Sequence, residues 1–246
     1  MVLKCLGSSS AGNCYILEAS DGQRLVIEAG VKWSQIKKGL AYRLLGVQGC
    51  LVSHRHNDHA ASIADVAKAG IKVLALEDVL VSHGIQRNHF AHAVEPLKGY
   101  KLGDYNVYTF DVRHDVPCLG FHIYHREMGN LLFATDTMML EYRFEGLKAV
   151  NHWLVEANYA DDILEDNIKS GYVNASMRER LLETHMELQT TKGILTSNDL
   201  SKTRQIVLIH LSMDNAEPWR FRDEIESSTG IPTHIASNGL LLDMDL

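Results

Sequence analysis

Four side chains that commonly bind metal ions lie within six residues of this chain, in the run His54-Arg55-His56-Asn57-Asp58-His59. The apolar residues 50–52 before this run are typical of a buried strand, and residues 60–67 after it are typical of a helix. A strand end followed by a helix start is where α/β proteins build their sites. Because imidazole and carboxylate ligands together suit zinc, manganese or iron, the run predicts a metal centre.

The spacing of this run is that of an H-x-H-x-D-H signature, and with it the chain resembles the metallo-β-lactamase superfamily. The resemblance implies an α/β fold, the αββα four-layer sandwich, with two metal ions at one edge. It also implies three later ligands at strand ends, which are a third His, a bridging Asp and a final His. The chain offers each type at or just past the end of an apolar run: His114 after residues 105–110, Asp136 after residues 131–135 and His210 after residues 206–209.

The resemblance assigns these side chains to two divalent cations. The first cation receives His54, His56 and His114. The second cation receives Asp58, His59 and His210, and Asp136 bridges the two cations. Zinc is the metal that these ligand types favour first, with Mn²⁺ as the alternative.

Several shorter motifs, taken together with the ligand run, resemble the YycJ-like branch of the superfamily. These motifs are Gly7–Asn13, His114–Phe121, Glu156–Asn158 and His210–Asn215. Members of that branch are regarded as cytoplasmic DNA exonucleases or related phosphodiesterases. The resemblance therefore implies that the partner of this chain is a DNA end or another phosphodiester, and no protein partner is evident from the sequence.

The loop Gly7–Asn13, rich in glycine and serine, has two interpretations. It is either a plain hairpin turn or a loop that lines the metal site and holds a phosphate or polar group of the substrate. In the second interpretation Ser9 and Asn13 bind substrate, and Asn158 of the Glu-x-Asn element does the same.

Two elements depart from the pattern of the family. Glu28-Ala29-Gly30 stands where the superfamily usually has Asp-Ala-Gly, and we expect the extra methylene to alter a bond to a ligand His. Thr184-His185-Met186-Glu187 stands where the branch tends to have Gly-His-Leu-Ser. His185 is then either a proton donor over the site or a solvent-exposed residue at a helix end.

The composition favours one α/β domain in a reducing compartment. Of the 246 residues, 46% are hydrophobic and 22% charged, and no linker divides the chain, so we expect a single domain over residues 1–246. No apolar run approaches the roughly 20 residues of a membrane helix, so no membrane segment is expected. The four cysteines form no C-x-x-C pair and are expected to be buried free thiols, which predicts a cytoplasmic protein.

Hydrophobic spacing predicts the main elements of the chain. Strands are expected at residues 3–6, 14–17, 25–28, 50–53 and 73–76. Helices are expected over residues 33–45, within the polar segment 161–190, after Ser197 and after Asp214. This order of elements fits the two halves of a sandwich.

The expected activity is hydrolysis by two adjacent cations, which lower the pKa of a bridging water toward roughly 7 and so supply hydroxide. Asp136 orients this hydroxide, Asp58 helps to position it, and His185 or a metal-bound water protonates the leaving group. The net charge of −7 disfavours a broad basic face for long nucleic acid. The alternatives to a DNA exonuclease are a hydrolase of small thioesters, lactones or cyclic nucleotides, and a metal-stabilised binding protein.

Overall fold

The strands of the computed structural model, which describes residues 1–141 and 150–246, form two seven-stranded sheets. The first sheet has the order β14-β1-β2-β3-β4-β5-β6. Its strands are β1 (Val2–Gly7), β2 (Cys14–Glu18), β3 (Arg24–Ile27), β4 (Val47–Leu51), β5 (Val73–Ala75), β6 (Ala91–Ala93) and β14 (Leu241–Asp243). The last strand of the chain thus pairs with the first, antiparallel to it.

The second sheet has the order β13-β12-β11-β10-β9-β8-β7. Its strands are β7 (Gly99–Leu102), β8 (Tyr105–Val112), β9 (Cys118–His125), β10 (Gly129–Ala134), β11 (His152–Glu156), β12 (Gln205–Ile209) and β13 (Thr233–Ile235). Strands β7 to β10 form an antiparallel meander, and β10 to β13 are parallel.

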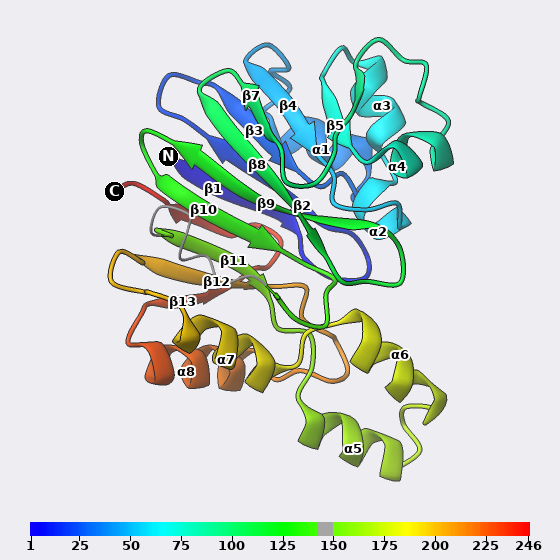
Figure 1. The fold of residues 1–246 in the computed structure, drawn as a ribbon, viewed down its shortest axis with the longest axis vertical. Coiled ribbons are helices and arrows are strands. Elements are labelled where there is room, and N and C mark those ends of the chain that lie inside the picture. Colours follow the sequence, from blue (N-terminus) through cyan, green and yellow to red (C-terminus); the bar gives the residue numbers. More distant parts are fainter. Residues whose placement is uncertain (142–149) are drawn as a thin grey trace.

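Helices lie outside both sheets (Figure 1). Those of the first half are α1 (Trp33–Gly39), α2 (Asn57–Ala60), α3 (Ile63–Lys68) and α4 (Glu77–Ser82). Those of the second half are α5 (Asp161–Lys169), α6 (Ser176–Thr184), α7 (Leu188–Ser197) and α8 (Pro218–Thr229). Helices α7 and α8 cover the second sheet, whereas α5 and α6 project from the sandwich beside it (Figure 1).

Three apolar layers hold the sandwich together, and strand β2 shows how they arise. Because side chains alternate along a strand, Tyr15 and Leu17 face the layer between the two sheets. Cys14 and Ile16 face the layer between the first sheet and its helices. A third layer lies between the second sheet and its helices and includes Trp153 and Phe221. The predicted αββα four-layer sandwich is confirmed.

The direction of the strands explains where a site can form. β3, β4 and β5 are parallel to one another, and so are β10, β11 and β12. Their carboxyl ends therefore open at one edge of the sandwich, where loops from both sheets meet.

Two predicted helices differ from the structure. The helix expected over residues 33–45 ends at Gly39, and Ala41 and Tyr42 then take positive φ angles that a helix cannot contain. The helix expected after Ser197 is absent, since the described residues between α7 and β12 form turns instead. There Asn198 caps α7 and the carboxylate of Asp199 accepts a hydrogen bond from Ser201 N at 2.9 Å.

The four cysteines are free and buried, as predicted. Among the described residues, no helix has the length and apolar character that crossing a membrane requires.

Candidate metal centre

The predicted metal ligands meet at the edge where the strands of both sheets end. His54, His56, Asp58 and His59 follow β4, and the other three ligands follow strands of the second sheet, namely His114 after β8, Asp136 after β10 and His210 after β12. The first ligand group is His54, His56 and His114, and the second is Asp58, His59 and His210. Within each group, one ligand atom from every residue lies within 4.8 Å of the others.

The first ligand group has the spacing of a shared cation. His54 Nε2 lies 3.0 Å from His56 Nδ1, and His114 Nε2 lies 3.4 Å from the same atom. Nitrogen ligands around a tetrahedral zinc, bonded at about 2.0–2.1 Å, stand roughly 3.3–3.4 Å apart. Ser53 Oγ lies 2.9 Å from His54 Nδ1 and can accept its proton, which leaves His54 Nε2 free to bind metal.

The second ligand group combines one carboxylate with two imidazoles. Asp58 Oδ2 lies 3.4 Å from His59 Nε2 and 3.5 Å from His210 Nε2. His210 Nε2 is buried and has no hydrogen-bond partner among the described residues. A buried ring nitrogen without a partner is costly, and a cation at this point would satisfy it. The residues present therefore fit a second divalent metal ion.

Asp136 lies between the two groups. Its Oδ2 atom is 2.7 Å from His59 Nε2. One carboxylate oxygen of Asp136 also lies within 4.8 Å of a ring nitrogen of His54. Asp136 thus shares neighbours with both groups, and its bridging role stays a prediction.

Three residues at the site take the left-handed backbone conformation that glycine usually occupies. They are Glu28, Asp136 and His210, with φ angles of 64°, 48° and 55°, and they follow β3, β10 and β12. Such a conformation costs on the order of 1–3 kcal/mol at a non-glycine residue. It turns the chain sharply at the strand end, so that the side chain reaches the site.

The loop between β1 and β2 supports two of the ligands. Ser8 Oγ accepts a hydrogen bond from His210 N at 2.9 Å. Asn13, which is buried, donates from Nδ2 to the main-chain oxygens of Ser9 and Asp58 at 3.1 and 3.2 Å. The same Nδ2 atom is 3.1 Å from His59 Nε2. The loop thus belongs to the site, with Asn13 against a ligand and Ser9 half-buried beside it.

Asn158 is also buried against a ligand. Its Nδ2 atom donates to the main-chain oxygen of His210 at 2.7 Å and lies 3.2 Å from His210 Nδ1. In this position the amide orients His210.

Glu156 is a site residue to which the sequence analysis gave no role. It is fully buried at the end of β11, and its Oε1 atom lies 2.7 Å from His185 Nδ1 and 3.2 Å from His210 Nδ1. Its other oxygen accepts hydrogen bonds from Thr137 N and Met186 N. Glu156 ends an apolar strand on a carboxylate, the same signal that singled out Asp136.

His185 lies over the centre rather than in open solvent. It follows α6, and its Nδ1 atom is 3.1 Å from Asp136 Oδ1 in addition to its contact with Glu156. No described residue hydrogen-bonds its Nε2 atom, so that nitrogen remains for a bound molecule.

The electrostatics of the protein without metal reflect this crowding. Burial and the neighbouring His59 lower the pKa of His54 well below its ordinary value. Burial alone would also lower the pKa of His210, but Asp136, Asp58 and Glu156 raise it to about 9. Protons therefore occupy part of the site in the absence of cations, and a metal ion must displace them.

Glu28 stands behind His59. Both side chains are fully buried, and Glu28 Oε2 lies 3.5 Å from His59 Nδ1, which has no hydrogen-bond partner among the described residues. Glu28 Oε1 instead accepts a hydrogen bond from Ser53 N at 3.2 Å. The long side chain thus braces the strand end that carries the ligand run and leaves only a loose contact with the imidazole.

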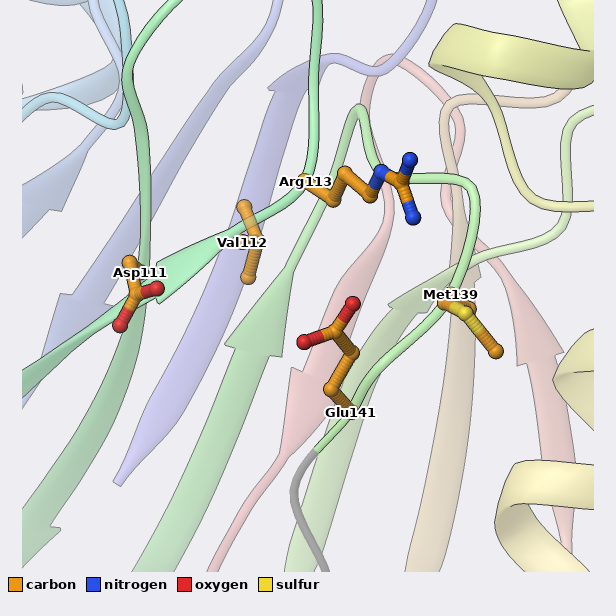
Figure 2. A pocket seen from close by; sticks show the side chains of 5 residues that line it. All are labelled: Asp111, Val112, Arg113, Met139 and Glu141. Carbon is orange, nitrogen blue, oxygen red and sulfur yellow. The ribbon is translucent and has the colours of Figure 1, made fainter.

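A cavity of about 350 Å³ opens onto the ligands. Its lining includes ligands from both groups and, outside the ligand set, Ser10, Arg180, Thr184 and His185. Another pocket lies beside the end of β8 and is lined by Asp111, Val112, Arg113, Met139 and Glu141 (Figure 2). That pocket contains none of the predicted ligands, so the first cavity is the candidate site.

The fold and the site define a metal-dependent hydrolase with a histidine- and aspartate-rich centre at the edge of an αββα sandwich. The sequence matches the metallo-beta-lactamase superfamily over residues 9–139, more than half of its length. The chain belongs to this superfamily.

Two relatives are similar to the chain over most of their length. A protein of Bacillus anthracis called exodeoxyribonuclease YycJ is 27% identical over 223 residues, which cover 85% of this chain and 82% of the relative. A protein of Streptococcus pneumoniae serotype 2 called exodeoxyribonuclease WalJ is 26% identical over 223 residues, covering 85% and 81%.

Solved structures share the fold over almost the whole chain. The metallo-beta-lactamase fold protein YhfI from Bacillus subtilis has a TM-score of 0.75 at 15% identity, covering 98% of this chain and 99% of its own. The Zn²⁺-bound PqqB from Methylobacterium extorquens has a TM-score of 0.75 at 15% identity, covering 99% and 100%.

Proposed function

We propose that this protein is a dinuclear-metal phosphodiesterase that removes nucleotides from DNA ends. The assembled ligand set, in which Asp136 joins two groups of ligand atoms, carries the hydrolytic part of the proposal. The two relatives called exodeoxyribonucleases, each aligned over 85% of the chain, support the choice of DNA.

We further propose zinc as the native metal and the cytoplasm as the compartment. Histidine and aspartate ligands at these spacings suit zinc, and manganese is the alternative. The four free, buried cysteines fit a reducing compartment. We expect residues 1–246 to act as a single domain.

The residues of the site have distinct roles in this proposal. Bound cations would supply Lewis acidity and lower the pKa of the attacking water. Asp136 and Asp58 orient the water that attacks phosphorus in line with the leaving oxygen. As the new P–O bond forms and the ester bond breaks, the leaving oxygen takes a proton. Glu156 holds His185 through Nδ1, so His185 Nε2 is placed to deliver that proton.

The proposal is tested with DNA substrates that differ only in whether they have an end. End-labelled linear DNA and a covalently closed plasmid of the same sequence are incubated with protein loaded with zinc or manganese. We expect nucleotides to be released from the linear DNA while the plasmid stays intact. Asp58→Ala should abolish this release, because the second ligand group loses its carboxylate, while circular dichroism stays unchanged.

Two outcomes would reject the exonuclease. Equal degradation of linear and closed DNA would show an endonuclease. No degradation of either, together with turnover of a thioester, lactone or cyclic nucleotide, would assign the centre to the small-molecule alternative.

A further inference from the structure

One permanently positive side chain that is not a predicted metal ligand lines the cavity over the ligands. This residue is Arg180, on α6. No other arginine and no lysine lines this cavity in the part of the chain that the structure describes. Thr184 Oγ1 donates to the main-chain oxygen of Arg180 at 2.6 Å, so two residues of the cavity wall are joined within one helical turn.

Arg180 differs from its neighbour on the same helix in lacking an ionic partner. Arg178 Nε forms an ion pair with Glu165 Oε1 at 3.1 Å and does not line the cavity. Arg180 is exposed and forms no ion pair with any residue in the described ranges 1–141 and 150–246. Its guanidinium therefore remains available to a bound molecule, in a chain where 31 acidic residues outnumber 24 basic ones.

The charge of the cavity selects the kind of molecule that binds there. Two divalent cations would outweigh the two carboxylates of Asp58 and Asp136, and Arg180 adds further positive charge. A guanidinium offers parallel N–H donors that match the oxygens of a phosphate. A neutral ester or lactone has no anionic oxygen to accept them.

We propose that Arg180 binds a phosphoryl oxygen of the substrate and makes this cavity selective for phosphoesters over neutral esters. The inference deepens the proposed function, on which it rests for the identity of the reaction. Arg180 acts in binding, whereas His185 and the aspartates act on the reacting atoms.

The test compares two substrates with the same leaving group, the anionic bis-p-nitrophenyl phosphate and the neutral p-nitrophenyl acetate. Arg180→Ala removes hydrogen bonds from a charged donor to the phosphate. From the strength of such bonds, we expect the KM for the phosphate to rise about tenfold to a hundredfold. Arg180→Lys should recover part of this loss, because it keeps the charge without the fork. Arg178→Ala is the matched control and should leave both substrates unchanged.

Binding without turnover separates this inference from the proposed function. Calorimetry measures the affinity of thymidine 5′-monophosphate for the metal-loaded protein, and circular dichroism checks the fold of each variant. If neither DNA nor the phosphodiester is hydrolysed but Arg180→Ala binds the nucleotide at least tenfold more weakly than Arg178→Ala does, the proposed function fails and the role of Arg180 stands. Unchanged nucleotide binding, or equal KM changes for both substrates, would overturn the role of Arg180.

Discussion

Glu28 shows at the scale of one residue how a buried group behind the centre can tune a ligand. When His59 binds a cation through Nε2, its Nδ1 atom carries a proton, and the carboxylate 3.5 Å away is the nearest anion to receive it. Once the carboxylate accepts a hydrogen bond from this nitrogen, it would fix the ring and make the other nitrogen a better ligand.

Glu28→Gln should therefore lower the affinity of the second ligand group for its metal by about tenfold to a hundredfold. The substitution removes the negative charge but keeps the length of the side chain. Competition with a coloured chelator measures the affinity. Glu95→Gln, which alters an exposed ion pair with Lys98, is the control and should have no effect. Equal affinities in both variants would show that Glu28 serves only to brace the strand end.

Single residues also show what could be predicted from the sequence. The seven ligands could be named because they follow the order of the superfamily and lie at or just past the ends of apolar runs, and all seven meet in the structure. Glu156 carries the same signal and begins the Glu-x-Asn motif, but that motif assigned a role only to Asn158. Arg180 could not be found, because an exposed arginine on a helix becomes part of a site only when distant strands place the ligands opposite it.

At the scale of elements, Gly30 allows two loops to come into contact. A Cβ atom at this position would lie 1.6 Å from the main-chain oxygen of Asp58. The contact is held by hydrogen bonds on both sides, from Asn13 N to Asp58 O at 2.7 Å and from Ala29 N to His59 O at 2.8 Å. The loops after β1 and β3 thus pack against the ligand run and hold its backbone in place.

Gly30→Ala should displace the ligand run, because the obstacle is backbone that cannot rotate away. We expect loss of hydrolysis and of one bound metal ion, together with lower thermal stability. Metal content and thermal melting are the measurements. The control is Gly193→Ala in α7, where a Cβ meets nothing within 4 Å and the protein should gain about 0.5–1 kcal/mol. A Gly30→Ala protein with full metal content would contradict this account.

Elements also explain why the helix over residues 33–45 was predicted too long. The chain leaves the helix at Ala41 and Tyr42, just after Gly39 packs so closely on the first sheet that a Cβ would lie 2.6 Å from Leu6, a contact between segments far apart in the sequence. Periodic apolar residues beyond Gly39 could not reveal this. Local patterns predicted an order of strands and helices that fits a sandwich, and the resemblance to the superfamily supplied the αββα arrangement.

At the scale of the whole molecule, both sheets contribute residues to each ligand group. The first ligand group takes two histidines from the first sheet and His114 from the second, and the second group takes Asp58 and His59 from the first sheet and His210 from the second. Metal ions bound to these groups would therefore join the two halves of the sandwich, and a ligand that binds only the folded state stabilises that state.

Metal removal should lower the melting temperature, and the difference should grow as the pH rises. Without metal, the pKa of His210 is about 9 in the folded chain against an ordinary value of 6.5. A raised pKa adds stability below pH 6.5, and that stability is lost as the pH rises through 9. Metal binding needs the unprotonated ring and strengthens over the same range.

Thermal melts of loaded and chelated protein between pH 6.5 and 9 measure this difference. His210→Ala removes the titrating ring, so its loaded and chelated forms should show a smaller change with pH. A gap in melting temperature that is constant or narrows in the native protein would contradict the prediction.

The left-handed backbone at Asp136 and His210 also bears on how this protein can evolve. Glycine adopts that conformation without strain, so replacing either residue by glycine relieves the backbone as it removes a ligand. In a gene copy freed from selection for hydrolysis, the relieved backbone strain therefore offsets part of the stability that is lost with the metal. Recovery of the centre by mutation is harder, because each restored ligand brings back the backbone strain before the complete ligand set can bind metal. Loss of either ligand therefore relieves backbone strain, whereas its recovery restores that strain.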